Sequence, residues 1–402
     1  MQQQEAPSRT GTLDLPDLND TQKAFAQKSD RELMQALWLF RIIGTPWLTS
    51  VGSAFTKAAL ALHLPVKGLV KATIFKQFCG GENIEESLRT ARQLAANGVG
   101  TILDYSVEGE DDQHAMDATA AEILRTIAAA KGDADIPFSV FKPSGVIRVD
   151  VLEKVSAGKK LNEEEAAAWE RGRKRVEGIC TAAHAADVPV LVDAEESWTQ
   201  DALDVLVTRM MQRFNGQRAI VYNTVQLYRH DRLAFLRKEA EMAKAKGYHL
   251  GMKFVRGAYM EKERERATEM GYTDPIGATK AAVDADFDNA LRYAAEHIDH
   301  MAVLVGTHNE ESTLLMARLM HETGLPKNDP RIHFGQLLGM SDNISFNMAD
   351  GGYNVVKYVP YGPVRKVLPY LIRRAQENTS ARGQTGRELS LILTERRRRA
   401  GK

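Results

Sequence analysis

PVLVDAEES, residues 189–197, is an apolar run that ends in a cluster of acidic side chains. A strand that is apolar on both sides has both faces buried, which is typical of a parallel sheet covered by helices. AVLVGTHN, residues 302–309, repeats the pattern with polar residues after the apolar run. The two stretches therefore predict buried parallel strands whose carboxyl ends carry polar side chains.

Comparable runs recur from residue 70 onward and alternate with segments of helical spacing. The segments between them, such as 83–98 and 231–247, carry apolar residues every three to four positions and end in glycine, as amphipathic helices do. Eight strand–helix units predict an α/β fold, a (β/α)₈ TIM barrel and not an open doubly wound sheet. The eight runs span residues 72–78, 100–106, 137–145, 189–197, 220–228, 250–259, 302–309 and 332–340, and a ninth, NVVKYVPYG, spans 354–362.

Most of these runs end in side chains that can do chemistry. In (β/α)₈ barrels the carboxyl ends of the strands build the active site. We therefore expect a charged barrel mouth made of Asp104, Lys142, Asp193 with Glu195, Gln226, Arg256 with Tyr259, and His308 with Asn309.

The composition excludes several classes of protein. Lys plus Arg and Asp plus Glu both count 53 in 402 residues, so the overall charge gives no reason to expect nucleic acid as a partner. Cys79 and Cys180 form no CxxC pair, which argues against a disulfide framework or a structural zinc site and suits a reducing cytoplasm. The first twenty residues have the character of neither a secretory signal nor a transit peptide, and we interpret them as a leader.

No stretch reaches the ~18 uninterrupted apolar residues that a membrane span requires. The nearest candidate runs from Leu33 to Thr56 and is broken by Arg41, Gly44 and Pro46. We expect this segment to lie on a membrane surface and not to cross a bilayer.

YLIRRAQEN, residues 370–378, places four polar or aromatic side chains on one helical face. Tyr370, Arg373, Arg374 and Glu377 stand at positions i, i+3, i+4 and i+7. Such a face suits a small carboxylate ligand, because a guanidinium can bind two oxygens at once. The alternative is an exposed helix stripe with an i,i+4 ion pair.

Lys142 and Asp193 each end a predicted strand and allow two interpretations. Carboxylates such as Asp193 and Glu195 suit Mg²⁺ or Mn²⁺, but no HxH or HExxH motif occurs among the ten histidines. An ion pair between Asp193 and Lys142 at the barrel mouth is the simpler interpretation, and we expect no metal.

LGMKFVRGAY, residues 250–259, places Lys253 and Arg256 inside an apolar run, with Gly257 allowing close backbone approach. Buried cations need a partner, and a flavin ring or a phosphate could provide it. No GxGxxG follows any strand, so a Rossmann-type dinucleotide site is not expected. THN at 307–309, after the predicted seventh strand, together with Thr279 and Lys280 at a helix start, is a candidate phosphate site.

The chain ends in TERRRRAGK, a basic block after the apolar segment LSLIL. One interpretation is a cationic helix C-terminus that complements the helix dipole. Attraction to an anionic membrane surface is the other.

Five motifs, in chain order, closely resemble those of the proline dehydrogenases, the single-function kind without a fused aldehyde dehydrogenase. They are MKFVRGAY, THNEES, FGQLLGM, YVPYGP and YLIRRAQEN, and the similarity covers about residues 70–381. The resemblance implies a distorted barrel that holds FAD, oxidises L-proline to Δ1-pyrroline-5-carboxylate and passes electrons to a membrane quinone. It divides the chain into an N-terminal leader and mostly helical segment (1–69), the barrel (70–381) and a basic C-terminal tail (382–402).

Matching the motifs residue by residue implies the contents of the site. The implied ligands of the substrate carboxylate are Lys142, Arg373 and Arg374. The implied walls around the proline ring are Tyr259, Leu337, Tyr358 and Tyr370. The implied contacts of FAD are Asp193, Gln226, Lys253, Val255, Gly257, Thr279, Lys280, Thr307, His308, Asn309 and Glu377.

The resemblance also carries expectations about catalysis and partners. Lys142, Asp193, Arg373 and Arg374 are the implied catalytic set. The protein would work in the bacterial cytoplasm, peripherally on the inner membrane, and a separate pyrroline-5-carboxylate dehydrogenase would take its product onward. Many bacterial members read RLVKGAY where this chain reads KFVRGAY, so two cations have exchanged places.

Three alternatives stay open from the sequence. A hydroxyproline dehydrogenase is the first alternative. Tyr358 speaks against it, because a phenol there leaves no room for a 4-hydroxyl group and similar enzymes acting on hydroxyproline have a smaller residue at this position. A metal-dependent aldolase or hydrolase barrel would use Asp193 and Glu195 as ligands and hold no flavin. A non-catalytic barrel that binds amino acids would keep the arginine pair and lose the cofactor.

Overall fold

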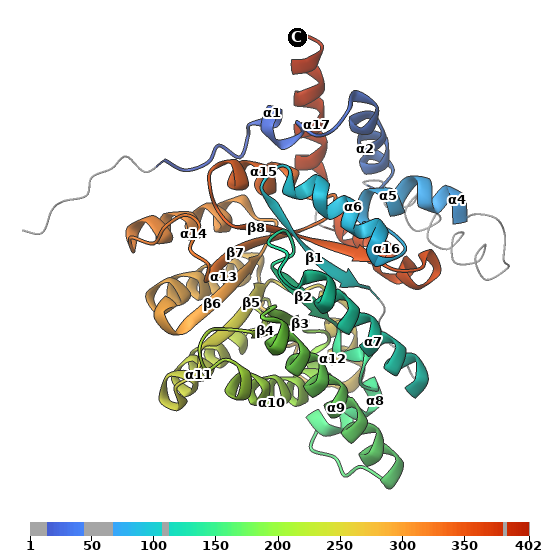
Figure 1. Cartoon of the computed structure of the whole chain (residues 1–402), viewed down its shortest axis with the longest axis vertical. Helices are drawn as coiled ribbons and strands as arrows, with labels where there is room; N and C mark the ends of the chain where they lie inside the picture. Colours follow the sequence, from blue (N-terminus) through green and yellow to red (C-terminus); the bar gives the residue numbers. More distant parts are fainter. Residues whose placement is uncertain (1–13, 44–66, 107–111, 381–383, 402) are drawn as a thin grey trace, which may run out of the picture.

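The computed structural model describes residues 14–43, 67–106, 112–380 and 384–401 (Figure 1). Eight parallel strands follow one another in chain order and close into a barrel, in which the eighth strand pairs with the first. The strands are β1 (Val99–Tyr105), β2 (Phe138–Phe141), β3 (Val190–Val192), β4 (Val221–Gln226), β5 (Leu250–Val255), β6 (Met301–Gly306), β7 (Ile332–Leu337) and β8 (Val355–Tyr361).

Helices alternate with the strands and surround the barrel (Figure 1). Those that follow the strands are α7 (Gln113–Ala130), α8 (Val149–Ser156), α9 (Glu163–Ala186), α10 (Ser197–Phe214), α11 (Arg232–Lys246), α12 (Met260–Met270), α13 (Lys280–Glu296), α14 (Glu310–Glu322), α15 (Asp342–Asp350) and α16 (Val364–Ser380). Those before β1 and at the end of the chain are α1 (Thr21–Ala24), α2 (Asp30–Ile43), α4 (Lys67–Val70), α5 (Lys76–Phe78), α6 (Ile84–Ala95) and α17 (Gln384–Arg399). The prediction of a (β/α)₈ barrel with an N-terminal helical part is confirmed.

One of the eight predicted strands is wrong. Residues 71–75 form a π-helix that runs into α5, so ATIFKQF is helical. The buried residues of this run, Phe75 and Phe78, are three positions apart and lie on one helical face against α2, which outweighs the strand preference of the β-branched residues. The ninth run is β8, so the THN motif follows the sixth strand and not the seventh.

The closing pair of strands is long and regular. β1 and β8 pair over seven residues, from Val99 opposite Val355 to Tyr105 opposite Tyr361. Side chains alternate between the two faces of a strand, so Val356 and Tyr358 point into the barrel while Lys357 points to the outside. The barrel interior is filled by a cluster of buried residues: Ile102, Phe138, Val140, Leu191, Ala219, Tyr222, Ala302, Leu304, Val356 and Tyr358.

The helix after β8 leaves the barrel wall. Val367 and Leu371 of α16 pack in a separate apolar cluster with Phe40 of α2 and Phe75 of the π-helix. In Figure 1 the arrowheads of β1 and β8 point toward the side of the molecule on which α16 lies. The helix that carries the YLIRRAQEN motif is therefore at the carboxyl end of the strands, where barrel enzymes build their sites.

The two ends of the described chain pack together. The carboxylate of Glu395 in α17 accepts a hydrogen bond from Thr21 at 3.0 Å, and Arg399 pairs with Asp30 at 2.8 Å. Figure 1 shows α17 beside α1 and α2. The basic tail is thus mostly the helix α17, and its four consecutive arginines form the last turn. Two of them, Arg398 and Arg399, pair with Glu395.

Candidate active site

Two lysines and two aspartates meet at the carboxyl ends of neighbouring strands. Lys142, after β2, lies 3.0 Å from Asp104 of β1 and 3.6 Å from Asp193 after β3. Lys253 of β5 lies 2.5 Å from Asp193. Lys142, Asp104 and Lys253 are each less than a tenth exposed. The expected ion pair between Lys142 and Asp193 is present, but Lys142 lies closer to Asp104, and the lysine closest to Asp193 is Lys253.

The two lysines keep Asp193 ionised. Burial alone would raise the pKa of this carboxyl group, but the positive charges of Lys253 and Lys142 lower the pKa below its ordinary value. The mouth of the barrel therefore holds four fixed charges that balance one another. Such a cluster orients its members, because moving any one of them leaves a buried charge without its counterpart.

Tyr358 joins this cluster from β8. The Lys253 ammonium donates a hydrogen bond to the phenol oxygen of Tyr358 at 3.0 Å and lies 5.0 Å from the ring centre. Burial and the nearby carboxylates of Asp193 and Asp104 raise the pKa of Tyr358 well above its ordinary value. Tyr358 is therefore a neutral phenol that stands at the floor of the mouth.

Helix α16 brings the arginine pair to the same region. The guanidinium carbon of Arg373 lies 5.7 Å from the ring centre of Tyr259, which follows β5, and that of Arg374 lies 5.0 Å from the ring centre of Tyr370. Arg374 and Tyr370 are buried. Contact between α16 and the residue after β5 places this helix across the mouth and not along the wall.

Leu337 connects the two parts of the predicted substrate wall. It packs both against the barrel interior that contains Tyr358 and against the apolar cluster that contains Tyr370. The structure thus places Leu337 between the strand that carries one aromatic wall residue and the helix that carries another. Glu377 falls in the part of α16 whose side chains lie outside the described residues.

The second cation of the 250–259 run, Arg256, directly follows β5 and is held by other groups of the chain. Arg256 pairs with Asp284 of α13 at 2.8 Å and donates hydrogen bonds to Thr307 and Ser312 at 3.0 Å each. The sequence suggested a flavin or a phosphate as partner for both cations of this strand. In the structure carboxylates of the chain are their partners, because β5 is flanked by acids from the neighbouring units.

The backbone after β5 requires glycine. Gly257 has a φ of +112°, and a Cβ there would lie 2.4 Å from the ring of Tyr228. A side chain at this position would be strained in conformation and would clash with a buried ring. Gly257 therefore lets the backbone after Val255, the last residue of β5, pass close to the Tyr228 ring.

The remaining residues predicted to contact FAD lie along the carboxyl ends of β4 and β6 and at nearby helix starts. Thr279 and Asn309 are N-caps, since their side chains accept hydrogen bonds from backbone N–H groups of Ala282 and Ser312. Lys280 is exposed and pairs with Asp284. The Nδ1 atom of His308 lies 2.9 Å from the Ser341 hydroxyl. Burial, with the charges of Lys357 and Arg374, lowers the pKa of His308 to about 3, so the ring is neutral.

These groups fit a flavin. The Gln226 side chain donates to the Glu195 carbonyl at 2.8 Å, while its buried Oε1 atom has no hydrogen-bond partner within the described residues. A buried acceptor of this kind calls for an N–H donor. The N–H of an isoalloxazine ring is such a donor.

The carboxylates that a metal site would use are otherwise engaged. Glu195 accepts two hydrogen bonds from Ser144, at 2.8 Å from its N–H and 2.5 Å from its hydroxyl, and Asp193 pairs with lysines. Among the described residues no group of three or more His, Cys, Asp or Glu side chains is arranged to hold a metal ion.

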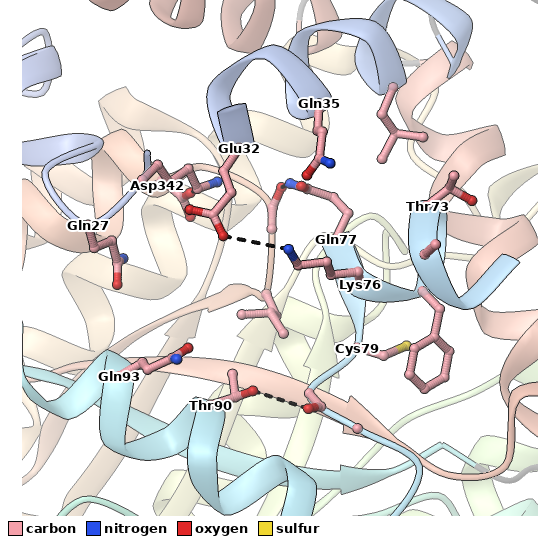
Figure 2. Close-up of a pocket in the computed structure, with 18 of the residues that line it drawn as sticks. Gln27, Glu32, Gln35, Thr73, Lys76, Gln77, Cys79, Thr90, Gln93 and Asp342 are labelled. Carbon is pink, nitrogen blue, oxygen red and sulfur yellow. Dashed lines mark hydrogen bonds and ion pairs between the residues drawn. The ribbon is translucent and has the colours of Figure 1, made fainter. Parts of the chain in front are cut away.

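A cavity of about 1040 Å³ lies elsewhere, on the outer side of β8. Figure 2 shows Glu32 of α2 paired with Lys76 of α5 and Thr90 of α6 bonded to Gly80 around it. None of the residues predicted to bind proline or FAD lines this cavity. We therefore locate the candidate active site by the buried charges at the strand ends.

Asp104 is the site residue that sequence reasoning left without a role. Asp104 ends a predicted strand, and β1 and β2 are neighbours in chain order, so its pairing with Lys142 follows if consecutive strands are adjacent in space. The contact of His308 with Ser341 could not be predicted in the same way, because the two residues lie in loops after different strands, β6 and β7.

Comparison with known proteins identifies a family to which this chain is similar. The model of the proline dehydrogenase family matches residues 87–387. The carbapenem antibiotics biosynthesis protein CarD of Pectobacterium carotovorum subsp. carotovorum is 37% identical over 322 residues, covering 80% of this chain and 83% of that protein. The mitochondrial proline dehydrogenase 1 of Dictyostelium discoideum is 30% identical over 426 residues, covering 94% and 74%.

Two further comparisons bear on substrate and fold. The hydroxyproline dehydrogenase of Bos taurus is 31% identical over 425 residues, covering 94% of this chain and 92% of that protein. The crystal structure of proline utilization A (PutA) from Bdellovibrio bacteriovorus inactivated by N-propargylglycine superposes with a TM-score of 0.70 at 19% identity, covering 89% of this chain. The present chain spans only 38% of that longer chain, and at this identity the likeness shows the shared fold alone.

Proposed function

The chain belongs to the proline dehydrogenase family, and we propose that it oxidises L-proline to Δ1-pyrroline-5-carboxylate with FAD as its cofactor and a membrane quinone as the final electron acceptor. In this reaction a C–H bond at C5 and the amine N–H bond break, and a C=N bond forms. When bound, the flavin would supply the two-electron acceptor for the hydride.

The residues of the chain would bind and orient the substrate. Arg373, Arg374 and Lys142 would hold the carboxylate, since guanidinium and ammonium groups bind carboxylates through charge-assisted hydrogen bonds. The aromatic rings near them would hold the apolar ring, and the helix above the mouth would limit access of water. Orientation is the main contribution, because a hydride transfer requires a short, aligned approach of the reacting atoms.

The Lys253–Asp193 pair would place a fixed positive charge beside the cofactor. In the flavin site implied by the resemblance, this ammonium lies near the ring. A positive charge there would favour the electron-rich reduced form. Because Asp193 holds Lys253 at 2.5 Å, the charge is present before any ligand binds.

The observation that carries the proposal is the convergence of Arg373 and Arg374 of α16 with Tyr259 and Tyr370 at the mouth that also holds Lys142. This arrangement sets each guanidinium beside an aromatic ring, with the Lys142 ammonium at the carboxyl end of the same barrel. Proline has the complementary carboxylate and methylene groups.

The direct test uses the purified protein as it is expressed. It should be yellow with bound flavin, and the colour should bleach when L-proline is added without oxygen. Arg373→Met should raise the proline KM by at least about tenfold, because a charge-assisted hydrogen bond contributes ~1.5–3 kcal/mol. Arg365→Met, which removes an exposed cation from the same helix, is the control. A colourless protein, or an Arg373→Met variant with the KM of Arg365→Met, would refute the proposal.

Hydroxyproline is the second candidate substrate, because a hydroxyproline dehydrogenase is among the relatives. Tyr358 favours proline. Its phenol is buried at the mouth and hydrogen-bonded to Lys253, so it would occupy the space that a 4-hydroxyl group needs. Comparable kcat/KM values for proline and trans-4-hydroxyproline would overturn this choice.

Delivery of electrons to a quinone would bring the protein to a membrane surface. Within the described ranges no helix combines the length and the apolar character that spanning a bilayer requires. Of the candidate segment 33–56, residues 33–43 lie in α2, where Trp38 and Ile42 are 57% and 49% exposed, and residues 44–56 lie outside the described residues. Flotation with anionic liposomes of Trp38→Ser/Ile42→Ser against wild type tests α2, and equal flotation would exclude it.

A further inference from the structure

The loop that follows β7 is fixed by groups from outside the barrel mouth. Lys357, on the outer face of β8, donates hydrogen bonds to the carbonyls of Met340 at 2.8 Å and Leu337 at 3.3 Å. Gln77 of α5 donates to the carbonyl of Gly339 at 2.9 Å. The N–H of Ser341 donates to the Glu388 carboxylate of α17 at 2.5 Å. Residues 337–341 therefore depend on three distant elements.

A buried ion triad fixes the end of the same loop. Asp342 lies 2.7 Å from Lys28, which precedes α2, and 2.8 Å from Lys357. Asp342 and Lys357 are less than a tenth exposed. Both terminal regions of the chain thus reach this loop, Lys28 from the N-terminal side and Glu388 from the C-terminal side. Figure 2 shows Asp342 beside the cavity next to α2.

The loop adopts a conformation that needs external support. Ser341 has φ 49° and ψ 45°, the left-handed region that residues with a Cβ seldom occupy. Gly339 has a φ of +77°, and a Cβ there would lie 2.1 Å from the carbonyl oxygen of Gln77. The hydrogen bond from the Ser341 N–H to Glu388 supports this strained serine, since it satisfies a buried donor.

Ser341 in turn touches the candidate flavin site. Its hydroxyl lies 2.9 Å from Nδ1 of His308, one of the residues expected to contact FAD. The other end of the loop is Leu337, an expected wall of the proline site. A shift of Ser341 would therefore change both the orientation of the His308 ring and the placement of Leu337.

We propose that Glu388 is a positioning residue for the flavin site: it holds the Ser341 backbone so that the serine hydroxyl orients His308. This inference rests on the proposed function, because it assumes that His308 contacts FAD. It assigns a catalytic purpose to α17, a helix that lies beyond the last strand–helix unit of the barrel.

The burial of Glu388 supports a specific role for this side chain. Burial, and then the charge of Asp342, raise the pKa of Glu388 to about 7, although the hydrogen bond from the Ser341 N–H and then the charges of Lys28 and Lys357 act in the opposite direction. A carboxylate in such surroundings gains little from ion pairing. Its hydrogen bond to Ser341 is the specific contact that this position provides.

The test compares four variants, with the FAD dissociation constant as the main readout and the proline KM and kcat as the second. Glu388→Ala removes the acceptor and should weaken FAD binding about tenfold or more, because the buried N–H of Ser341 loses its hydrogen-bond acceptor. Glu388→Gln keeps an acceptor of the same shape and should restore binding to within about twofold. Leu391→Ala, a buried apolar truncation in α17, should lower the melting temperature and leave FAD affinity within about twofold of wild type.

The fourth variant, Ser341→Ala, removes only the hydroxyl and should also weaken FAD binding about tenfold or more. It tests the same contact with His308 if Glu388→Ala does not fold. Wild-type affinity in Ser341→Ala, or an equal loss in Leu391→Ala and Glu388→Ala, would overturn the inference. A wild-type protein that binds no FAD would refute the proposed function itself. The two failures are therefore distinguishable.

Discussion

The charge cluster at the barrel mouth makes a quantitative prediction for Asp193→Asn. This substitution keeps the shape of the side chain and removes its charge. At an effective dielectric constant of ~20, unit charges separated by 2.5 Å and 3.6 Å attract by about 7 and about 5 kcal/mol respectively. Desolvation offsets most of this attraction, and removing one partner of a buried pair costs ~3–5 kcal/mol net. We expect the free energy of unfolding to fall by that amount.

The loss should fall mainly on Lys253. Lys142 keeps Asp104 at 3.0 Å, whereas among the described residues Lys253 keeps the neutral phenol of Tyr358 alone. Removing the unpaired charge of Lys253 as well should restore most of the lost free energy of unfolding. We expect Asp193→Asn/Lys253→Met to be more stable than Asp193→Asn by about 2 kcal/mol or more.

Urea unfolding followed by circular dichroism and tryptophan fluorescence, at one fixed flavin concentration, measures these differences. Asp299→Asn is the matched control, because it removes a carboxylate that is 87% exposed and pairs with Arg331 at the surface. It should cost less than about 1 kcal/mol. The reasoning is wrong if Asp193→Asn lowers the free energy of unfolding no more than Asp299→Asn does. It is also wrong if the losses from Asp193→Asn and Lys253→Met add in the double variant.

Three further predictions concern specificity, pH and backbone strain. Tyr358→Ser should raise the preference for trans-4-hydroxyproline over proline at least about tenfold in kcat/KM, since a steric block worth ~1.4 kcal/mol is removed, and an unchanged ratio would contradict the steric explanation. Burial alone would raise the pKa of Glu395, but its two arginine partners in α17 and its other hydrogen bonds lower it to about 2, so this carboxylate stabilises the fold above about pH 4.5 and the contribution disappears as the pH falls toward 2. Hydrogen exchange should then show α17 opening before the barrel, and simultaneous opening of both would refute the prediction. Gly257→Ala should lower the free energy of unfolding by more than about 1 kcal/mol because of its positive φ and the Tyr228 ring, whereas Gly178→Ala, in a helix with open space around it, should raise stability by up to ~1 kcal/mol. Urea unfolding of both variants is the measurement, and equal effects would count against the strain argument.

Much of the fold was predictable because its signals are local. Apolar runs such as VLV at 190–192, alternating with helical spacing, identify buried strands whatever their partners are. The acids and lysines at the strand ends were also predictable as a group, since parallel strands bring their carboxyl ends to one edge. The exception is 72–78, whose β-branched residues predict a strand. The structure has a helix there, because Phe75 and Phe78 are buried together on one helical face.

The sequence by itself determined the alternation of elements and the location of charge at the barrel mouth, because both depend on residues close together in the chain. The sequence predicted the pair of Lys142 and Asp193, but only the tertiary structure decided the other partners. Lys253 meets Asp193 across 60 residues, and Ser341 meets Glu388 across 47. Such contacts depend on how the strands close into a barrel and on where the terminal helices pack. Local sequence periodicity predicts neither of these features.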